Sequence, residues 1–462
     1  MNKFKIIGYT FFFIVFMMVF QACKVAQNYH LPPQDVKVDS LYRDVNTQDT
    51  TSIADLSWKQ LFSPKLQALI AEAISNNYDL KVAVARIHQA EANFKQSKLA
   101  MLPSLEVNAS AEYQNPSDVQ NSANQIYQLY ASSSWEVDIW GKLRSSKRAA
   151  LASLLQSEAY KRYVQTQLIS QIAADYYTLL ADDAQLALTV KTVENRKEDV
   201  VTVQALKDGD AATGADVVQS EANRYSAEVT IPDIKQDIRH TENAICVLIG
   251  RTPGTIDRDS LSAESVVANL PTGIPSQLLA NRPDIQQSEL QLRNAFEMTN
   301  IARTYFYPAL TITAEAGLYN NTMSNFFNAS SFFANIIGGL TQPIFNNGLN
   351  KQRLAIAKAQ QEEYLADYKK TWLTAGQEVS DALFQYQAAQ DKIAVRSNEI
   401  SNLLKSVDYT KELMKYTNKA NYTDVLTSEQ NLLSAQLSSI SDKLQQLQAV
   451  VSLYVSLGGG WK

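Results

Sequence analysis

The feature that most constrains this chain is the stretch from Lys142 to Asp208, which contains neither glycine nor proline. Its apolar side chains recur at steps of three, four or seven residues, which is the spacing of a packed α-helix; they include Val164, Leu168, Ile172, Tyr176, Leu179, Leu186, Val190 and Val193. A single helix over this stretch extends about 100 Å. Such a helix cannot be enclosed in a compact globule, so the sequence predicts rods that pack side by side.

The second half of the chain repeats the first. From Leu349 to Lys419 the only glycine or proline is Gly376, and an apolar stripe again follows helical spacing. Aligning the two halves places Asp79 on Asp284, Pro103 on Pro308, Gly141 on Gly348 and Asp216 on Asp424. A shared order of breaks and periods over this length indicates an internal duplication. Whatever one half forms, we expect the other to form as well.

Between the helical stretches, each half switches to strand spacing. After Pro103, apolar Leu105 and Val107 alternate with polar Glu106 and Asn108, and the segment after Pro308 repeats this pattern. We predict strands near 104–115 and 126–139 in the first half and near 309–320 and 331–343 in the second. Each half therefore reads helix, strand, strand, very long helix, turn, helix.

Strands of this length with one apolar and one polar face suit a transmembrane β-barrel. The alternative is an antiparallel sheet packed on a soluble core, which the same alternation allows. Four strands cannot close a barrel, because transmembrane barrels begin at about eight strands. Unpaired edges in lipid cost several kcal/mol per backbone group, so a membrane location requires several chains to share one barrel.

The N-terminus indicates export. The apolar run Ile6–Phe20 is shorter than the roughly 20 residues of a spanning helix, and it follows Lys3 and Lys5, as in a secretory signal peptide. The tetrad Phe20–Cys23 resembles a bacterial lipobox, which predicts cleavage after residue 22 and lipid on Cys23. The alternative is an ordinary signal peptide whose cysteine is incidental. The polar, proline-containing residues after Cys23 suit a tether.

Composition narrows the function classes. The net charge is −5 and acidic and basic residues are interspersed, so the sequence indicates no surface that binds nucleic acid. The mean hydropathy of −0.22 excludes a polytopic helical membrane protein. The internal Cys246 has no cysteine to pair with and is expected to be buried. No catalytic motif is present, and His30, His88 and His240 lack metal-ligand spacing. We therefore expect no enzymatic activity, no metal and no cofactor.

Five motifs in order carry a resemblance that covers the mature chain: WEVDIWGKLR from Trp135, GIPSQLLANRPDIQQSELQL from Gly273, ARTYFYPALTI from Ala302, PIFNNGLNKQRLAIAKAQ from Pro343 and LYVSLGGGW from Leu453. With them, the chain resembles TolC-type outer-membrane efflux proteins. Within these it resembles the lipoprotein branch (NodT family), the outer-membrane factors of tripartite resistance-nodulation-division efflux systems.

The resemblance implies an α+β membrane protein. Its trimer would combine four strands per chain into a twelve-stranded outer-membrane β-barrel, continued through the periplasm by an α-helical barrel. It also implies acylation (palmitate) of Cys23, contact with outer-membrane lipid, and two partners, a periplasmic adaptor (membrane fusion protein) and an inner-membrane pump. Polar residues on the long helices, such as Gln165, Gln171, Asp175, Asp182 and Asp183, would then face the lumen or solvent.

The expected domain organisation follows the two repeats. The chain would comprise a signal peptide (1–22), a lipidated tether with an equatorial segment (23–63), a first efflux repeat (64–250), an equatorial linker (251–274), a second repeat (275–457) and a tail (458–462). The long helices would cover about 142–207 and 349–418. Pro232 removes a backbone donor from the helix that follows the first tip, whereas its counterpart is Ile440, so we expect the two halves to bend differently.

The turns after the long helices would form the periplasmic tips, where the family closes its pore. By alignment, the family's aperture aspartate and arginine positions fall near Thr427 and Gln430, which cannot form that salt bridge. The nearby acids Asp216, Glu221, Asp424 and Glu429 are candidates for an anionic ring, and the alternative is that they stabilise helix N-termini.

The expected function is a passive exit duct for small molecules in multidrug efflux. Two alternatives stay open: a type I protein-secretion channel, and a non-conducting coiled-coil lipoprotein that acts as a spacer.

Overall fold

The structure is a computed structural model that describes residues 25–31, 41–43, 52–114, 124–265, 271, 277–417 and 419–461. The signal peptide and Cys23 lie outside these residues. The chain forms two compact units. The first comprises residues 1–34, 85–158 and 287–369, and the second comprises 35–84, 159–286 and 370–462.

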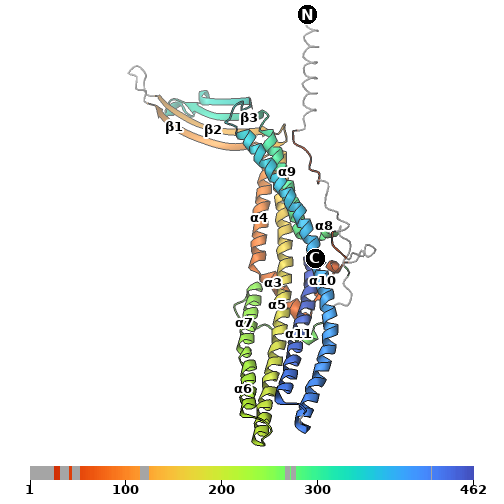
Figure 1. The fold of residues 1–462 in the computed structure, drawn as a ribbon. Helices are drawn as coiled ribbons and strands as arrows, with labels where there is room; N and C mark the ends of the chain where they lie inside the picture. Colours follow the sequence, from red (N-terminus) through yellow and green to blue (C-terminus); the bar gives the residue numbers. More distant parts are fainter. Residues whose placement is uncertain are drawn as a thin grey trace. The chain divides into compact units, whose positions relative to one another are not determined.

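The order of elements is the same in both halves (Figure 1). In the first half, α4 (Tyr78–Leu99) leads to β1 (Ser104–Gln114), β2 (Asn124–Val137), α5 (Lys142–Asp208) and the pair α6 (Gly214–Glu228) and α7 (Thr230–Leu248). In the second half the same order is α9 (Pro283–Thr304), β3 (Ala309–Asn320), β4 (Phe332–Thr341), α10 (Leu349–Tyr416) and α11 (Tyr422–Ser456). The short helices α2 (Trp58–Leu61), α3 (Pro64–Asn76) and α8 (Gln277–Asn281) accompany them. The predicted α+β fold with tandem repeats is thereby confirmed.

The first unit contains a four-stranded antiparallel sheet in the order β1-β2-β3-β4. Its register aligns Leu105, Ser133, Ala314 and Ile336 across the strands, and the next row is Glu106, Ser132, Glu315 and Asn335. Partners in a register row point to the same face. The sheet therefore has one face rich in apolar residues and one rich in polar residues.

The apolar face is exposed in the single chain. Leu105 and Val107 on β1 are 75% and 73% exposed, and Ile336 and Leu340 on β4 are 78% and 66% exposed. A soluble sheet buries such a face against a core. The sheet therefore does not pack its apolar face on a soluble core within the chain, which was the alternative to a membrane barrel.

Two strands end two residues earlier than expected. The strand expected at 126–139 occupies Asn124–Val137, because the Asp138 carboxylate turns away to accept hydrogen bonds from the backbone N–H groups of Leu143 and Arg144, 3.0 Å each. The strand expected at 331–343 occupies Phe332–Thr341, and Pro343 follows it without a donor for the ladder.

The second unit is a set of long helices packed along their apolar stripes. Ile169, Ile172, Tyr176 and Leu179 of α5 are fully or almost fully buried, and so are Trp372, Ala375 and Val379 of α10 and Leu453 and Tyr454 of α11. Cys246 is a free, buried thiol, as expected. Among the described residues, no helix is both long and apolar enough to cross a membrane.

Pro232 interrupts the helix that follows the first tip, as predicted. The helical stretch is interrupted at Val229, three residues before the proline, which separates α6 from α7. Its counterpart in the second half, α11, runs without a break from Tyr422 to Ser456. Pro232 cannot donate a hydrogen bond to the carbonyl of Glu228, which explains why the break falls there.

The single glycine in the second long helix has a packing role. A Cβ atom at Gly376 would lie 2.5 Å from the backbone oxygen of Leu41. The segment Leu41–Arg43 therefore lies directly against α10 in the second unit. A larger residue at this position would displace it.

Candidate functional site

The motif WEVDIWGKLR joins the sheet to the first long helix in the first unit. Besides capping α5, Asp138 accepts a hydrogen bond from Arg144 Nε at 3.0 Å. Lys142 pairs with Glu136 at 3.0 Å, and Trp140 Nε1 donates to the carbonyl of Pro308 at 2.8 Å. These contacts fix the direction in which α5 leaves β2.

The start of the second repeat packs against the C-terminus in the second unit. The Arg282 guanidinium is almost fully buried and forms ion pairs with Asp284 at 2.6 Å and Glu378 at 2.7 Å. It also donates to the carbonyl of Ser456 at 2.8 Å. A Cβ atom at Gly458 would lie 2.5 Å from the backbone of Asn281, whose carbonyl accepts from Trp461 Nε1. The ANRPD and GGGW segments thus form one structural contact.

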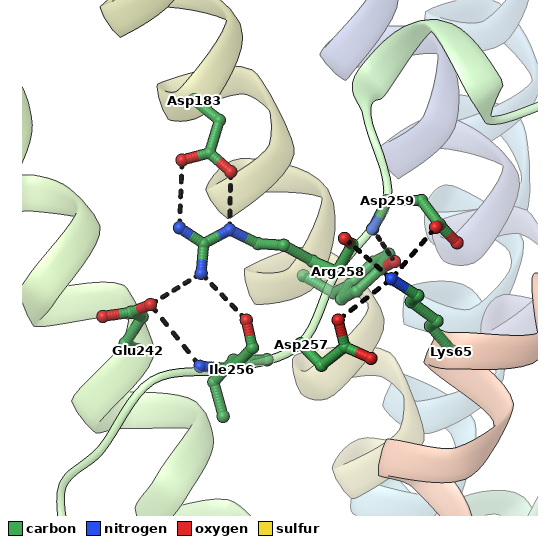
Figure 2. A network of polar contacts seen from close by, with 8 residues as sticks. Lys65, Asp183, Glu242, Ile256, Asp257, Arg258 and Asp259 are labelled. Atoms are coloured by element: carbon green, nitrogen blue, oxygen red, sulfur yellow. Dashed lines mark hydrogen bonds and ion pairs between the residues drawn. The ribbon is translucent and has the colours of Figure 1, made fainter.

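The linker between the repeats is held by an ion-pair network (Figure 2). Arg258 lies between Asp183 of α5 and Glu242 of α7, and its Nη1 atom lies 2.6 Å from Glu242. Lys65 of α3 pairs with the residues on either side of Arg258, Asp257 at 2.9 Å and Asp259 at 3.2 Å. Hydrogen bonds to Asp183 and Glu242 hold the pKa of Arg258 above its usual range, so its charge is permanent. The linker is clamped to three helices.

Two polar residues expected to face a lumen or solvent have partners inside the chain. Asp183 binds Arg258, and Gln165 donates to the carbonyl of Gly460 at 3.1 Å. Distant segments of the chain therefore supply partners for these two side chains, and their place on a lumen or solvent face stays a prediction. Asp182 precedes Asp183 on α5, and burial together with the neighbouring Asp237 and Asp183 raises its pKa to about 6.

The helices after both tips start with the same device. Thr213 and Asp216 form a capping box at the start of α6, and Asn421 and Asp424 form one at the start of α11. The backbone hydrogen bonds from Thr213 and Asn421 to the carboxylates measure 2.8 and 2.9 Å. Both aspartates therefore stabilise helix N-termini, and a role in an anionic ring stays a prediction.

The other candidate aperture residues have different surroundings. Glu221 is exposed on α6, and Thr427 donates its hydroxyl to the carbonyl of Thr423 at 2.8 Å within α11. Gln430 accepts a hydrogen bond from Arg196 Nη2 of α5 at 2.8 Å. Arg196 is only 7% exposed and also binds the carbonyl of Asn223 on α6. Gln430 thus connects the second hairpin to the first.

Glu429 takes part in a second connection between the hairpins. Lys411 of α10 lies 2.5 Å from Glu429 of α11 and 3.6 Å from Asp199 of α5. Burial and the neighbouring Glu429 carboxylate raise the pKa of Asp199 to about 6. Burial alone would lower the pKa of Lys411, but its ammonium donates hydrogen bonds to Glu429 and Asp199, which raise the pKa overall, so the lysine stays charged. We call Asp199, Lys411 and Glu429 the clasp.

The sequence did not single out Arg196, Asp199, Lys411 or Arg258. Each lies on a helix or linker rich in charged residues, and its partner is distant in sequence. The local pattern carries only one signal, a charged residue on an otherwise apolar face, as at Arg196. Among the described residues, no group of three or more histidine, cysteine, aspartate or glutamate side chains is placed to hold a metal.

The sequence profile of the family described as "Outer membrane efflux protein" matches residues 69–251 and 274–459. The chain is 30% identical over 462 residues to the probable efflux pump outer membrane protein TtgC of Pseudomonas putida, covering 95% of this chain and 93% of that protein. It is 27% identical over 451 residues to the cation efflux system protein CusC of Escherichia coli, covering 95% and 96%.

Solved structures share the fold. The outer-membrane channel OprN superposes with a TM-score of 0.87 at 24% identity, covering 95% of this chain and 100% of that one. The open state of the Neisseria gonorrhoeae outer membrane channel MtrE gives a TM-score of 0.85 at 25% identity, covering 95% and 99%.

Proposed function

Because the chain belongs to the outer membrane efflux protein family, we propose that three copies of it form a passive exit duct across the outer membrane. The observation that carries the proposal is the four-stranded sheet with an exposed apolar face and a polar opposite face. Its outer strands β1 and β4 each pair on one side only. In lipid these edges need partners, and three copies supply them in a closed barrel of about twelve strands.

The long helices support the same assembly. On α10, Leu373, Phe384 and Val395 are 59%, 70% and 70% exposed in the single chain. They follow an 11-residue spacing, about 3.67 residues per turn, so they form a nearly straight stripe along the helix. A neighbouring copy would cover this stripe when the helices form a barrel. The tunnel would then lie inside a wall of rods.

The partners follow from the family, because relatives of this chain are named as outer membrane proteins of efflux pumps. We assign the energy and the choice of small-molecule cargo to an inner-membrane pump, and the connection to a periplasmic adaptor that meets the tips. The chain itself acts without catalysis. The lipid on Cys23 would add an anchor to the one supplied by the barrel.

Electrical recording tests the proposal. Purified protein should run as heat-modifiable trimers from outer-membrane fractions and should give discrete currents in planar bilayers. A soluble monomer without currents would overturn the duct and favour the non-conducting spacer. The exposed apolar face of the sheet argues against a spacer, which has no use for it.

A further inference from the structure

We propose that the clasp of Asp199, Lys411 and Glu429 is a proton-dependent latch between the two helix hairpins of one protomer. The inference rests on the proposed duct, and it adds a regulatory device to it. The latch connects α5 of the first hairpin with α10 and α11 of the second. The latch is closed when the carboxylates of Asp199 and Glu429 share a proton. The latch weakens when this proton is lost.

The charges in the clasp do not balance. Asp199 contributes a carboxylate from α5, Glu429 contributes another from α11, and Lys411 of α10 is the only cation between them. Another cation, Arg196, lies one turn earlier on α5 and is already bound to Gln430 and to the carbonyl of Asn223. On α6, Arg224 stacks on Tyr225 at 4.3 Å. Two buried carboxylates therefore compete for one ammonium group.

One proton relieves this conflict. Side chains of Asp199 and Glu429 are only 15% and 17% exposed, so water screens their repulsion weakly. A protonated Asp199 can donate a hydrogen bond to the Glu429 carboxylate, which then keeps its ion pair with Lys411. Loss of the proton replaces that hydrogen bond with repulsion between α5 and α11.

The surrounding packing lets the hairpins respond. A pocket of about 830 Å³ is lined by α5, α10, α11 and the linker, including Ala184, Ala187, Ile393, Ser439 and Ser260. On the far side of the cavity Gln448 donates to Thr178 at 3.2 Å. Arg196 and the clasp are polar contacts that join the tip-proximal halves of the two hairpins, so a change at the clasp weakens that connection.

The sign of the pH effect follows from linkage. Asp199 binds its proton more tightly when the hairpins are together, with a pKa of about 6, than when they are apart and the carboxyl is solvated. Protonation therefore favours the closed latch below about pH 6, and opening becomes easier as the pH rises through that value. Between pH 5.0 and 7.5 the ratio of open to closed latches should rise about tenfold per protomer.

Bilayer recordings of the full-length trimer at pH 5.0 and 7.5 test the latch. Wild type should show a several-fold higher open probability at pH 7.5. Asp199→Asn keeps the shape and the hydrogen bond without the charge, so it should stay closed at both pH values. Glu198→Gln, an equally small change at the exposed neighbouring residue, should keep the wild-type response.

Lys411→Met provides an independent arm. It leaves two carboxylates without a cation and should raise the open probability at pH 7.5. Currents that do not change with pH in wild type, or an equal pH response in Asp199→Asn, would overturn the latch and leave the duct intact. Membrane-inserted trimers without any current would instead overturn the duct.

Discussion

At the residue scale, single charged side chains join segments that are far apart in sequence. Arg258 comes from the linker and its partners Asp183 and Glu242 come from α5 and α7. The sequence cannot reveal such a pairing, because helical periodicity describes one element at a time. The sequence predicted that Asp183 faces the lumen or solvent, and only the fold shows that it binds Arg258.

We expect Arg258→Gln to destabilise the second unit by about 3 kcal/mol, because it leaves the Glu242 carboxylate, which is only 11% exposed, without its cation. The measurement is thermal dissociation of the trimer followed on gels. Arg251→Gln is the matched control, since Arg251 is 52% exposed and pairs with Glu72 near the surface. That pair should contribute less than about 1 kcal/mol. An equal loss of stability in both variants would show that Arg258 stabilises the second unit no more than an exposed ion pair does.

The first tip has a pH dependence of its own. Hydrogen bonds from Thr213 lower the pKa of Asp216, so the ionised carboxylate stabilises the start of α6. This contribution is complete above the ordinary aspartate pKa and is lost as the pH falls through the lowered value. Asp216→Asn should reduce amide hydrogen-exchange protection at the start of α6 at pH 7. Protection equal to wild type would show that the capping box contributes nothing.

At the element scale, most of the fold could be predicted because its signals are local. Helical and strand spacing predicted the long helices and the strands. The internal duplication predicted the same order of elements in both halves. The residues at which helices and strands end were harder to predict from the sequence. The turn after Val137 depends on Asp138 capping a helix that begins at Lys142, and this contact does not change the alternation of the strand before it. Likewise, Gln430 binds Arg196 of α5, and Glu429 binds Lys411 of α10 beside Asp199 of α5, so no local pattern shows these partners.

The difference between the hairpins makes a paired prediction. Pro232→Ala restores a backbone donor for the carbonyl of Glu228, so α6 and α7 should join into one straighter helix without loss of stability. Ile440→Pro removes a backbone donor from the interior of α11, which should lower the stability of the protein by about 3 kcal/mol or more. Cryo-EM traces and thermal dissociation check both variants. A break that persists at Val229 in Pro232→Ala would mean that packing, rather than the proline, interrupts the helix.

At the scale of the whole molecule, the question is what fixes the protein in the membrane. The described residues after Cys23 are not a free tether in the first unit. Val25 is buried, and the backbone N–H and carbonyl of Gln27 bind the Asn300 side chain of α9 at 3.1 and 2.9 Å. Arg303 also donates to the Gln27 side chain at 2.9 Å, and Tyr29 stacks edge-on against Phe296. The N-terminal segment is therefore held by protein contacts.

Cys23→Ser separates the two attachments when export is preserved by a cleavable signal. Because the barrel presents its own apolar face to lipid and Gln27 stays bound to α9, trimers of this variant should remain in the outer-membrane fraction. Adding Asn300→Ala should release the N-terminal segment to limited proteolysis while the trimers still stay in the membrane. Trimers that became soluble on losing the cysteine would show that the lipid, and not the sheet, is the principal anchor. That result would also contradict the closed barrel, since a closed apolar band cannot leave lipid without aggregating.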